Sequence, residues 1–387
     1  MTDNRQPITE PDNRQRTENR QQNMETMKLT RRLQLIVDLP KGEERDEAFE
    51  KLYRWQNRAY RAANLIVSHH YIQEMVQEFL YLSEKVQYKL VDEKKDALGI
   101  FKQSRNNTTY RLVSDRFKGE IPTDILSNLN RALLLSFNKE KTAYWKGERS
   151  LKNFRRDMAF PFAPDECILG LHYNEEKKAF CFRLFKIPFR IYLGKDFTDK
   201  RKLLERAIAG ETSIRTSHLK LKDGKIFWLA VFTIEKEKNQ LKTGVIAEAS
   251  LSLEFPIVAK VHRTRLTIGS REEFLHRRLA IQAARRRAQA GATYSRSGHG
   301  TKRKLKAVES YREKERNYVH NRLHVYSRQL INFCVKQQAG TLVLVNQEDK
   351  IGIAKEEEFV LRNWSYYELM EKIKYKAEKA GIELIVE

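Results

Sequence analysis

The last quarter of the chain alternates between strand-like and helix-like patterns, and this alternation limits the folds it can form. Residues 340–346 are a short apolar run, Gly-Thr-Leu-Val-Leu-Val-Asn, which is typical of a buried strand. After a loop, a helix is predicted from Asn363 to Lys379, and Gly381 ends it. Residues 382–386 again favour a strand. This segment therefore predicts mixed α/β structure.

Three strands and two helices are predicted just before this segment. The strands are expected at residues 245–251, 255–261 and 265–268, and the helices at roughly 271–289 and 305–337, with a Gly- and Ser-rich loop at 291–300. The succession of three strands, two helices, a strand, a helix and a strand is that of the RNase H fold. Residues 242–387 are therefore predicted to form one α/β domain.

The first part of the chain changes its periodicity twice. Residues 28–39 alternate as a half-buried strand does, and the pattern then stays helical from residue 43 to about 144. Short strands follow residue 149, separated by turn signals such as Asp223-Gly224, and they predict a small β-barrel. The simplest topology places the first strand in this barrel, with the helical block inserted between.

The charge of the chain restricts its partners. Lys and Arg number 74 against 51 Asp and Glu, which gives a formal net charge of +23, spread along the whole chain. A distributed excess favours a long polyanion over one small acidic ligand. The sequence predicts a nucleic-acid-binding protein. It has no apolar run of membrane-spanning length and no signal-peptide core, so a cytoplasmic location and no membrane partner are expected.

The cysteines and the first residues exclude other classes of structure. Cys167, Cys181 and Cys334 show no CxxC spacing, so they predict core thiols rather than a zinc ribbon or a disulfide framework. Residues 1–23 are polar and almost free of apolar side chains, and they predict a disordered tail.

Four segments of the chain resemble the miniature type V-F CRISPR effectors and their TnpB ancestors. They are the strand–helix–strand segment at the C-terminus, the run Gly147 to Arg156 continued by Phe160-Pro161-Phe162, the basic start at residues 302–306 with Tyr311 to Glu315 and Asn321, and Pro256 to Ala259. The order and spacing of the segments carry the resemblance, which covers about residues 28–387.

The resemblance implies a multidomain α+β protein. Residues 24–40 and 149–241 would form a split wedge β-barrel, and residues 41–148 an inserted helical recognition domain. Residues 242–387 would form a truncated RNase H-like (RuvC) α/β domain that lacks the zinc-ribbon module of the family.

The resemblance also locates the positions of the catalytic acids. In the family the first strand carries an Asp and the fourth a Glu; the matching residues here are Ser250 and Val345, and the third Asp would lie beyond Glu387. Two divalent cations need carboxylate ligands, so these positions predict no catalytic residue, no metal and no enzyme activity. The alternative is an active endonuclease with displaced acids, Glu248 and Asp349.

Three sets of residues are candidates for nucleic-acid contacts. By the resemblance, guide RNA is expected to contact Arg149, Lys152, Asn153, Arg155 and Arg156. A stripe on the first inserted helix is a candidate for the short DNA motif beside the target, because Arg and Asn suit guanine and adenine edges: Arg54, Asn57, Arg58, Arg61 and Asn64. Two basic runs would contact the backbone of the guide–target heteroduplex: Arg285, Arg286 and Arg287, and Lys302, Arg303 and Lys304.

The sequence as a whole predicts a nuclease-dead, RNA-guided DNA-binding protein of the bacterial cytoplasm, associated with the nucleoid. A guide RNA would be required, whereas zinc and catalytic magnesium would not. Its partners would be guide RNA, double-stranded target DNA and, for control of transcription, a sigma factor or RNA polymerase; otherwise it would block a promoter. The resemblance also implies that the protein would form a homodimer. A guide-free nucleic-acid-binding protein is a further alternative.

Overall fold

The computed structural model describes residues 26–80, 105–194, 199–251, 255–293, 301–345 and 365–387. Residues 28–234 form one compact unit, called here the N-terminal unit. Residues 235–387 make up most of a second one, called here the C-terminal unit. The predicted tail at residues 1–23, together with Asp349, lies outside the described residues.

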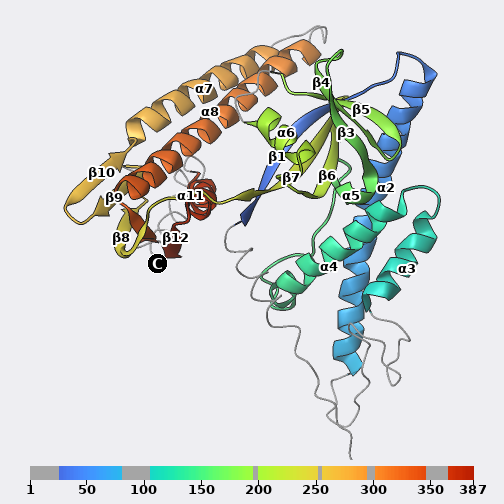
Figure 1. The fold of residues 1–387 in the computed structure, drawn as a ribbon, viewed down its shortest axis with the longest axis horizontal. Helices are drawn as coiled ribbons and strands as arrows, with labels where there is room; N and C mark the ends of the chain where they lie inside the picture. Colours follow the sequence, from blue (N-terminus) through green and yellow to red (C-terminus); the bar gives the residue numbers. More distant parts are fainter. Residues whose placement is uncertain (1–25, 81–104, 195–198, 252–254, 294–300, 346–364) are drawn as a thin grey trace, which may run out of the picture. The chain divides into compact units, whose positions relative to one another are not determined.

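Seven strands of the N-terminal unit form one curled sheet (Figure 1). They are β1 (Thr26–Val37), β2 (Phe160–Phe162), β3 (Ile168–Asn174), β4 (Ala179–Leu184), β5 (Ile187–Tyr192), β6 (Ile214–Lys222) and β7 (Lys225–Glu235), arranged in the order β2-β6-β7-β1-β5-β4-β3. The first strand thus lies between β7 and β5, although a helical block separates it from them in sequence. Because β2 and β3 stand at the two ends of this order, closure into a barrel stays a prediction.

Alternating apolar side chains explain why these segments are strands. In β1, Leu33, Leu35 and Val37 are buried while the residues between them are not. The turn between β6 and β7 consists of Asp223 and Gly224, both at positive φ (53° and 71°), which suits a two-residue hairpin and confirms the predicted turn.

Three long helices and two short ones accompany this sheet among the described residues of the N-terminal unit. They are α2 (Glu43–Leu80), α3 (Arg105–Phe117) and α4 (Thr123–Trp145), with α5 (Pro164–Cys167) and α6 (Lys200–Ile208) between strands. In α2, Leu52, Ala59 and Ile66 recur on one buried face. The sequence had suggested a separate helix from residue 71 to 91. Instead α2 continues without a break to Leu80, and the rest of that range lies outside the described residues.

The C-terminal unit contains a five-stranded mixed sheet. Its strands are β8 (Lys242–Ser250), β9 (Ile257–Val261), β10 (Thr264–Ile268), β11 (Ala339–Leu344) and β12 (Glu383–Val386), in the order β10-β9-β8-β11-β12. The first three strands pair antiparallel, whereas β11 runs parallel to both β8 and β12. The described elements follow the predicted succession, and their assignment to a truncated RuvC domain stays a prediction.

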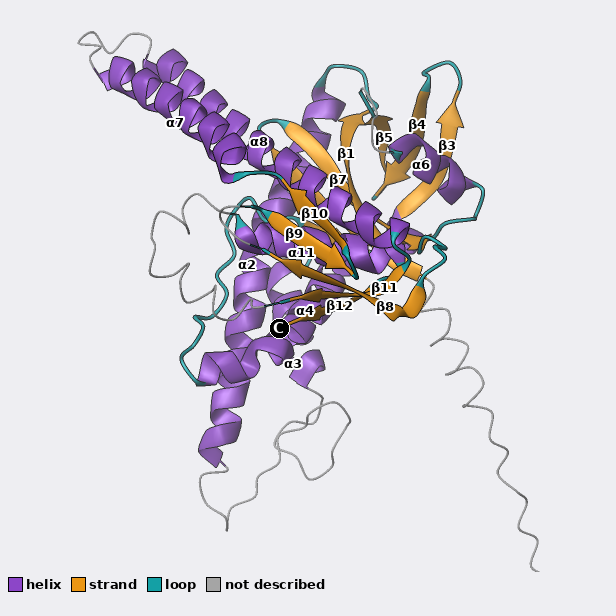
Figure 2. Cartoon of the chain, turned by 90° about the vertical axis from the view of Figure 1, so that its left-hand side faces the viewer, coloured by secondary structure: helices purple, strands orange, loops and turns teal. Residues whose placement is uncertain are grey.

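The described helices of this unit are α7 (Arg271–Thr293), α8 (Thr301–Lys336) and α11 (Tyr366–Ala380). The helices α8 and α11 pack on the sheet, and α7 packs mainly along α8. Apolar residues of α8 and α11, such as Leu323 and Ile373, pack with Ala247 and Ala249 of β8 in one core. In both views α7 and α8 lie side by side as a long hairpin (Figures 1 and 2). The helix α7 extends to Thr293, beyond the predicted end at about residue 289, and the rest of the predicted loop at 291–300 lies outside the described residues. Across the described residues, we find no helix of the length and apolarity that crossing a membrane requires.

Candidate nucleic-acid interface

The polar stripe on α2 is divided between exposed residues and residues that hold the fold. Arg54 and Arg61 are exposed, whereas Arg58 forms an ion pair with Glu120, and Asn57 is half-buried. The regular spacing of three and four residues along a helix explains why the sequence placed these side chains on one face. Only part of this stripe is therefore presented to a ligand.

Asn64, the fifth member of this stripe, binds the main chain of the N-terminal unit. Its Nδ2 donates to the carbonyl of Phe154 (2.9 Å), and the N–H of Phe154 donates to its Oδ1 (2.7 Å). A side-chain amide that satisfies both main-chain groups of one residue fixes the position of that segment. Asn64 thus anchors the segment that carries the predicted guide-RNA residues.

A cavity of about 450 Å³ opens beside the stripe. Its lining joins α2 to α3 and to the turn that follows α3, and it consists of Arg58, Arg61, Asn64, Leu65, Arg116, Phe117 and Glu120. Three guanidinium groups against one carboxylate make this cavity an anion-attracting site. Arg116 was not among the predicted residues, because nothing in the sequence indicates that α3 lies beside α2.

The segment from Arg149 to Arg156 is fastened to α4 at its first half. Arg149 Nη1 and Lys152 Nζ lie 3.0 and 2.8 Å from Glu140 Oε1, and Lys152 also donates to Ser136 Oγ (2.6 Å). The hydrogen bond from Lys152 and a second one from Tyr144 lower the pKa of Glu140. Asn153, Arg155 and Arg156 are exposed and face solvent.

Tyr60 connects two of the predicted sets of residues. Its hydroxyl accepts a hydrogen bond from Arg61 Nε at 3.4 Å, and the pKa of Tyr60 is lowered by hydrogen bonding to Arg61 first and to Arg156 second. Arg61 had been proposed for the DNA motif and Arg156 for guide RNA. Because Asn64 of the same helix binds Phe154, Arg156 lies near Arg61, and the region they share is called here the Tyr60 surface: Arg61, Arg156, Tyr60 and the cavity lined by Arg116.

The basic run on α7 is also divided. Arg285 Nη1 lies 3.5 Å from Glu315 Oε2 on α8, while Arg286 and Arg287 are exposed. Glu315 also accepts hydrogen bonds from Arg278 (2.9 Å) and Gln282 (2.7 Å), so it ties the two helices of the hairpin together. Lys302, Arg303 and Lys304 fall in the first turn of α8, and their side chains are not among those described.

The positions of the missing acids lie next to each other where the adjacent parallel strands β8 and β11 end. This edge of the C-terminal sheet is formed by the carboxyl ends of its parallel strands. Ser250 ends β8 and Val345 follows β11, and the N–H of Val345 donates to the carbonyl of Ala249 (3.0 Å). Glu248 is exposed, two residues before Ser250 and on the same face of the strand. Glu387 follows β12, and its N–H donates to Leu344 of β11 (3.0 Å).

The described residues of this edge do not fit a centre for two divalent cations. Such a centre requires several converging carboxylate oxygens. Glu248 and Glu387 supply separate carboxylates, and no group of three or more His, Cys, Asp or Glu residues placed to hold a metal occurs within the described ranges. The expectations about zinc and magnesium stay predictions.

Comparison with known proteins connects these features to a family. No family model matches the chain. A CRISPR-associated endodeoxyribonuclease Cas12f1 of Syntrophomonas palmitatica is 38% identical over 208 residues, which cover 52% of this chain and 39% of that protein. Another, of Sulfoacidibacillus thermotolerans, is 28% identical over 191 residues, 48% of this chain and 44% of that protein. This chain is related to the miniature type V-F CRISPR effectors.

A solved structure extends this relation to the fold of nearly the whole chain. The cryo-EM structure of a Cas12f1–sgRNA–target DNA complex superposes with a TM-score of 0.59 and 16% identity, covering 87% of this chain and 73% of that one. The alignments with the two type V-F relatives span less than half of their length, so what the complete relatives do is a hypothesis for this chain.

The relatives overturn one prediction. From Ser250 and Val345 we expected a chain that is not an enzyme, whereas both relatives are named endodeoxyribonucleases. Two substituted positions are not enough to infer the loss of activity, because Glu248 shares the face of Ser250 and because residues 252–254 and 346–364, which flank this edge in sequence, lie outside the described residues.

Proposed function

We propose that this chain is an RNA-guided DNA-binding protein, which holds a guide RNA and through it a matching double-stranded DNA. The Tyr60 surface carries this proposal, because it joins exposed guanidinium groups from two distant segments beside a cavity of about 450 Å³. The relation to the type V-F effectors and the net charge of +23 support it.

The proposed division of labour follows from the chemistry of the side chains. Arginines that reach phosphate oxygens fix the position of a nucleic acid without reading its sequence. Sequence would be read by base pairing between guide and target, and the protein would read only a short flanking motif. In this proposal Arg61 and Arg116 of the Tyr60 surface contact the DNA motif, whereas Arg156, with the neighbouring Arg155, contacts the guide RNA.

Copurification and binding test the proposal directly. RNA that copurifies with the protein is sequenced, and we expect one non-coding species with one variable end. Binding of matched and mismatched DNA is then compared for the double variant Arg61→Ala with Arg156→Ala and for the control Arg45→Ala, a half-buried arginine in the first turn of α2 that does not line the cavity. We expect the double variant to bind DNA more weakly and the Arg45→Ala variant to bind it as the wild type does. If the double variant and the control bind nucleic acid with equal affinity, this surface has no such role.

We further propose that occupancy of a promoter changes transcription. An R-loop is a near-balanced exchange of duplexes that protein contacts stabilise, and a protein resident at the start site excludes polymerase or recruits it through a sigma factor. Redirecting the guide across a reporter promoter tests this idea. A reporter that does not respond at any position, although crosslinking confirms occupancy, would contradict it.

Cleavage of the bound DNA is the second candidate function. The names of the type V-F relatives favour it, as does the exposed carboxylate of Glu248 beside Ser250. Guide-matched DNA is incubated with divalent cations and the products are separated on a denaturing gel. The control is Glu383→Gln, at an exposed glutamate of β12 in the same sheet. If Glu248→Gln abolishes cutting and Glu383→Gln preserves it, Glu248 takes part in the reaction.

A further inference from the structure

A second basic cavity in the N-terminal unit shares no lining residue with the first. It measures about 770 Å³, and β3, β4, β5, the turn between β3 and β4, and α6 surround it. Among the described residues, its lining includes four cationic side chains and no Asp or Glu: Lys177, Lys178, Arg190 and Arg201. A cavity of this size accommodates a small ligand, and its charge selects an anionic one.

Not all four cations are equally available. Lys177 Nζ lies 2.7 Å from Asp38 Oδ2, and Arg201 Nε lies 2.8 Å from Glu205 Oε1. Lys178 and Arg190 have no carboxylate partner in the part of the chain that the structure describes. Two side chains are thus left to bind an external anion such as a phosphate.

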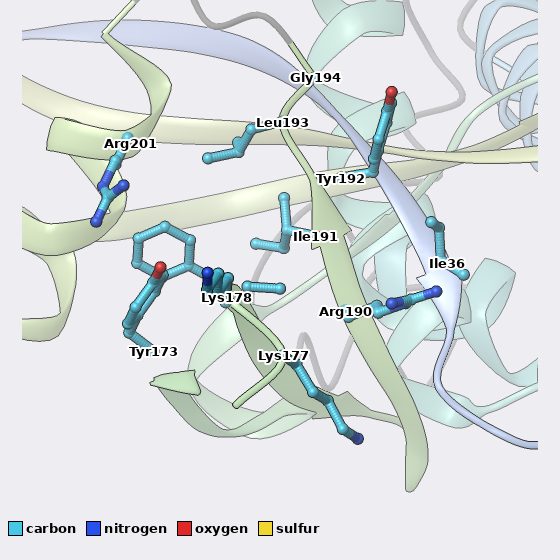
Figure 3. A pocket seen from close by; sticks show the side chains of 12 residues that line it. Ile36, Tyr173, Lys177, Lys178, Arg190, Ile191, Tyr192, Leu193, Gly194 and Arg201 are labelled. Carbon is cyan, nitrogen blue, oxygen red and sulfur yellow. The ribbon is translucent and has the colours of Figure 1, made fainter. Parts of the chain in front are cut away.

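Aromatic rings flank the cavity on two sides. Figure 3 shows Arg201 and Tyr173 on one side and Tyr192 with Arg190 on the other, with Ile191 and Leu193 between them. The ring of Tyr173 is already covered, because Arg201 Cζ lies 5.2 Å from its centroid and Phe180 packs edge-on at 5.0 Å.

Tyr192, in contrast, presents a bare ring, with 55% of the residue exposed. Gly194 lies beside this ring. A side chain at position 194 would begin only 3.5 Å from Tyr192 Cε1, in contact with the ring. Gly194 also has φ of 60°, a conformation that favours glycine. An exposed aromatic ring beside unpaired cations is the pattern on which unpaired bases stack.

From this arrangement we propose that the cavity binds an unpaired nucleotide of a nucleic-acid strand, with its base stacked on Tyr192 and its phosphate bound by Arg190 and Lys178. A base inside a duplex is covered on both faces by its neighbours and does not fit this arrangement. The proposal deepens the function proposed above and rests on it, since the strand would be the unpaired part of the guide RNA or of the opened DNA.

Short oligonucleotides test the cavity without any guide. The full chain, freed of RNA, is titrated with labelled single-stranded RNA, single-stranded DNA and a duplex hairpin, and fluorescence anisotropy is measured. We expect one of the single strands to bind at least about five-fold more tightly than the duplex, since stacking on one aromatic ring is worth about that factor or more. The preferred single strand identifies the source of the nucleotide.

Matched variants assign this binding to the cavity. Tyr192→Ala is expected to lose at least about five-fold in affinity for the single strand, and Tyr192→Phe to keep it. Tyr367→Ala, at an exposed tyrosine of α11, is the control. Arg190→Gln is compared with Arg183→Gln, an exposed arginine of the neighbouring strand β4 that does not line the cavity. Only Arg190→Gln should weaken binding and reduce the salt dependence.

The outcomes separate this proposal from the function on which it rests. Equal affinity for duplex and single strands, or equal effects of the cavity and control variants, overturns the nucleotide site. If RNA still copurifies in that case, the proposed function stands without this site. If the single strand binds through Tyr192 but the purified protein carries no RNA, the site stands and the guide hypothesis fails.

Discussion

Asn64 and Phe154 lie 90 residues apart in sequence and are joined by two hydrogen bonds, one in each direction, of 2.9 and 2.7 Å. This pair fastens the segment that carries Arg155 and Arg156 to the helix that carries Arg61. The geometry of the Tyr60 surface therefore depends on a residue that need not itself contact nucleic acid.

Replacing Asn64 by Asp tests this dependence. A carboxylate cannot donate to the Phe154 carbonyl, so Asn64→Asp leaves one partly buried main-chain group without a partner, and we expect a loss of about 1–3 kcal/mol in the free energy of unfolding. Asn57→Asp, on the same helix, should change it by less than about 0.5 kcal/mol. Urea denaturation measures both variants, and equal stabilities would show that the pair contributes nothing.

Lys376 of α11 predicts a pH dependence of stability. Its Nζ donates to Ser327 Oγ (2.7 Å) and to the carbonyl of His324, and burial lowers the pKa of Lys376 from 10.5 to about 8. Between these values the unfolded chain binds more protons than the folded one, so the free energy of unfolding rises with pH in this range.

The variant Lys376→Met removes this titration. From pH 7.5 to 10 we expect the wild-type protein to gain roughly 2 kcal/mol relative to Lys376→Met. Lys374→Met, at an exposed position of the same helix, should stay parallel to the wild type over the whole range. Denaturation curves recorded across this pH range decide the matter: a constant difference between wild type and Lys376→Met would mean that Lys376 titrates normally.

Glu315 holds the α7–α8 hairpin, and its removal should loosen it. Burial opposes the charge of Glu315, but hydrogen bonds from Gln282 and Arg278 outweigh this effect and lower its pKa. The side chains of Glu315 and Arg278 are each only 12% exposed, so Glu315→Gln leaves a nearly buried guanidinium without its counter-charge. We expect a loss of about 3 kcal/mol in the free energy of unfolding of the C-terminal unit.

The exposed Glu313 provides the control for this variant, and Glu313→Gln should have little effect. Because the pKa of Glu315 is lowered on folding, its contribution is present at neutral pH and is lost as the pH falls through the lowered pKa. Stability curves of wild type and Glu315→Gln should therefore converge in acid. Curves that stay apart there would point to packing rather than charge.

The α7 arginines allow a test of the heteroduplex prediction. Arg286 and Arg287 are exposed, so replacing both by Ala should weaken binding of target DNA about equally for different guides. The slope of the logarithm of the binding constant against the logarithm of the salt concentration should become shallower by about 0.9 for each phosphate that the variant no longer neutralises. Stability should not change. Arg285→Ala, in contrast, removes a partner of Glu315 and should also lower stability. A changed preference for the flanking motif would assign these residues to the DNA beside the target instead.

Local patterns predicted most of the fold. The alternation of β1 and the Asp223-Gly224 turn are properties of neighbouring residues, and both were placed within two residues of where the structure has them. The continuity of α2 beyond residue 71 was missed. The C-terminal part of α2, with the buried Gln73, has polar residues on the face that α3 covers. These polar residues weaken the apolar periodicity on which the sequence prediction relied.

The candidate sites were predicted less completely, because long-range contacts create them. A stripe of Arg and Asn on α2 is visible in the sequence, but the partner that makes Asn64 structural is 90 residues away. The cavity at Tyr192 left no sequence signal at all, since Lys178, Arg190 and Arg201 come from a turn, a strand and a helix. Such a site becomes visible only when the sheet order is known.

Guided DNA binding tests the central claim most directly. The protein, purified with its own RNA, is mixed with duplex DNA that matches the variable end of that RNA and with the same duplex carrying mismatches in the segment that pairs first. We predict tight binding of the matched duplex, clearly weaker binding of the mismatched one, and loss of both after treatment with ribonuclease. Equal binding of the two duplexes, unaffected by ribonuclease, would contradict the account and leave a guide-free DNA-binding protein.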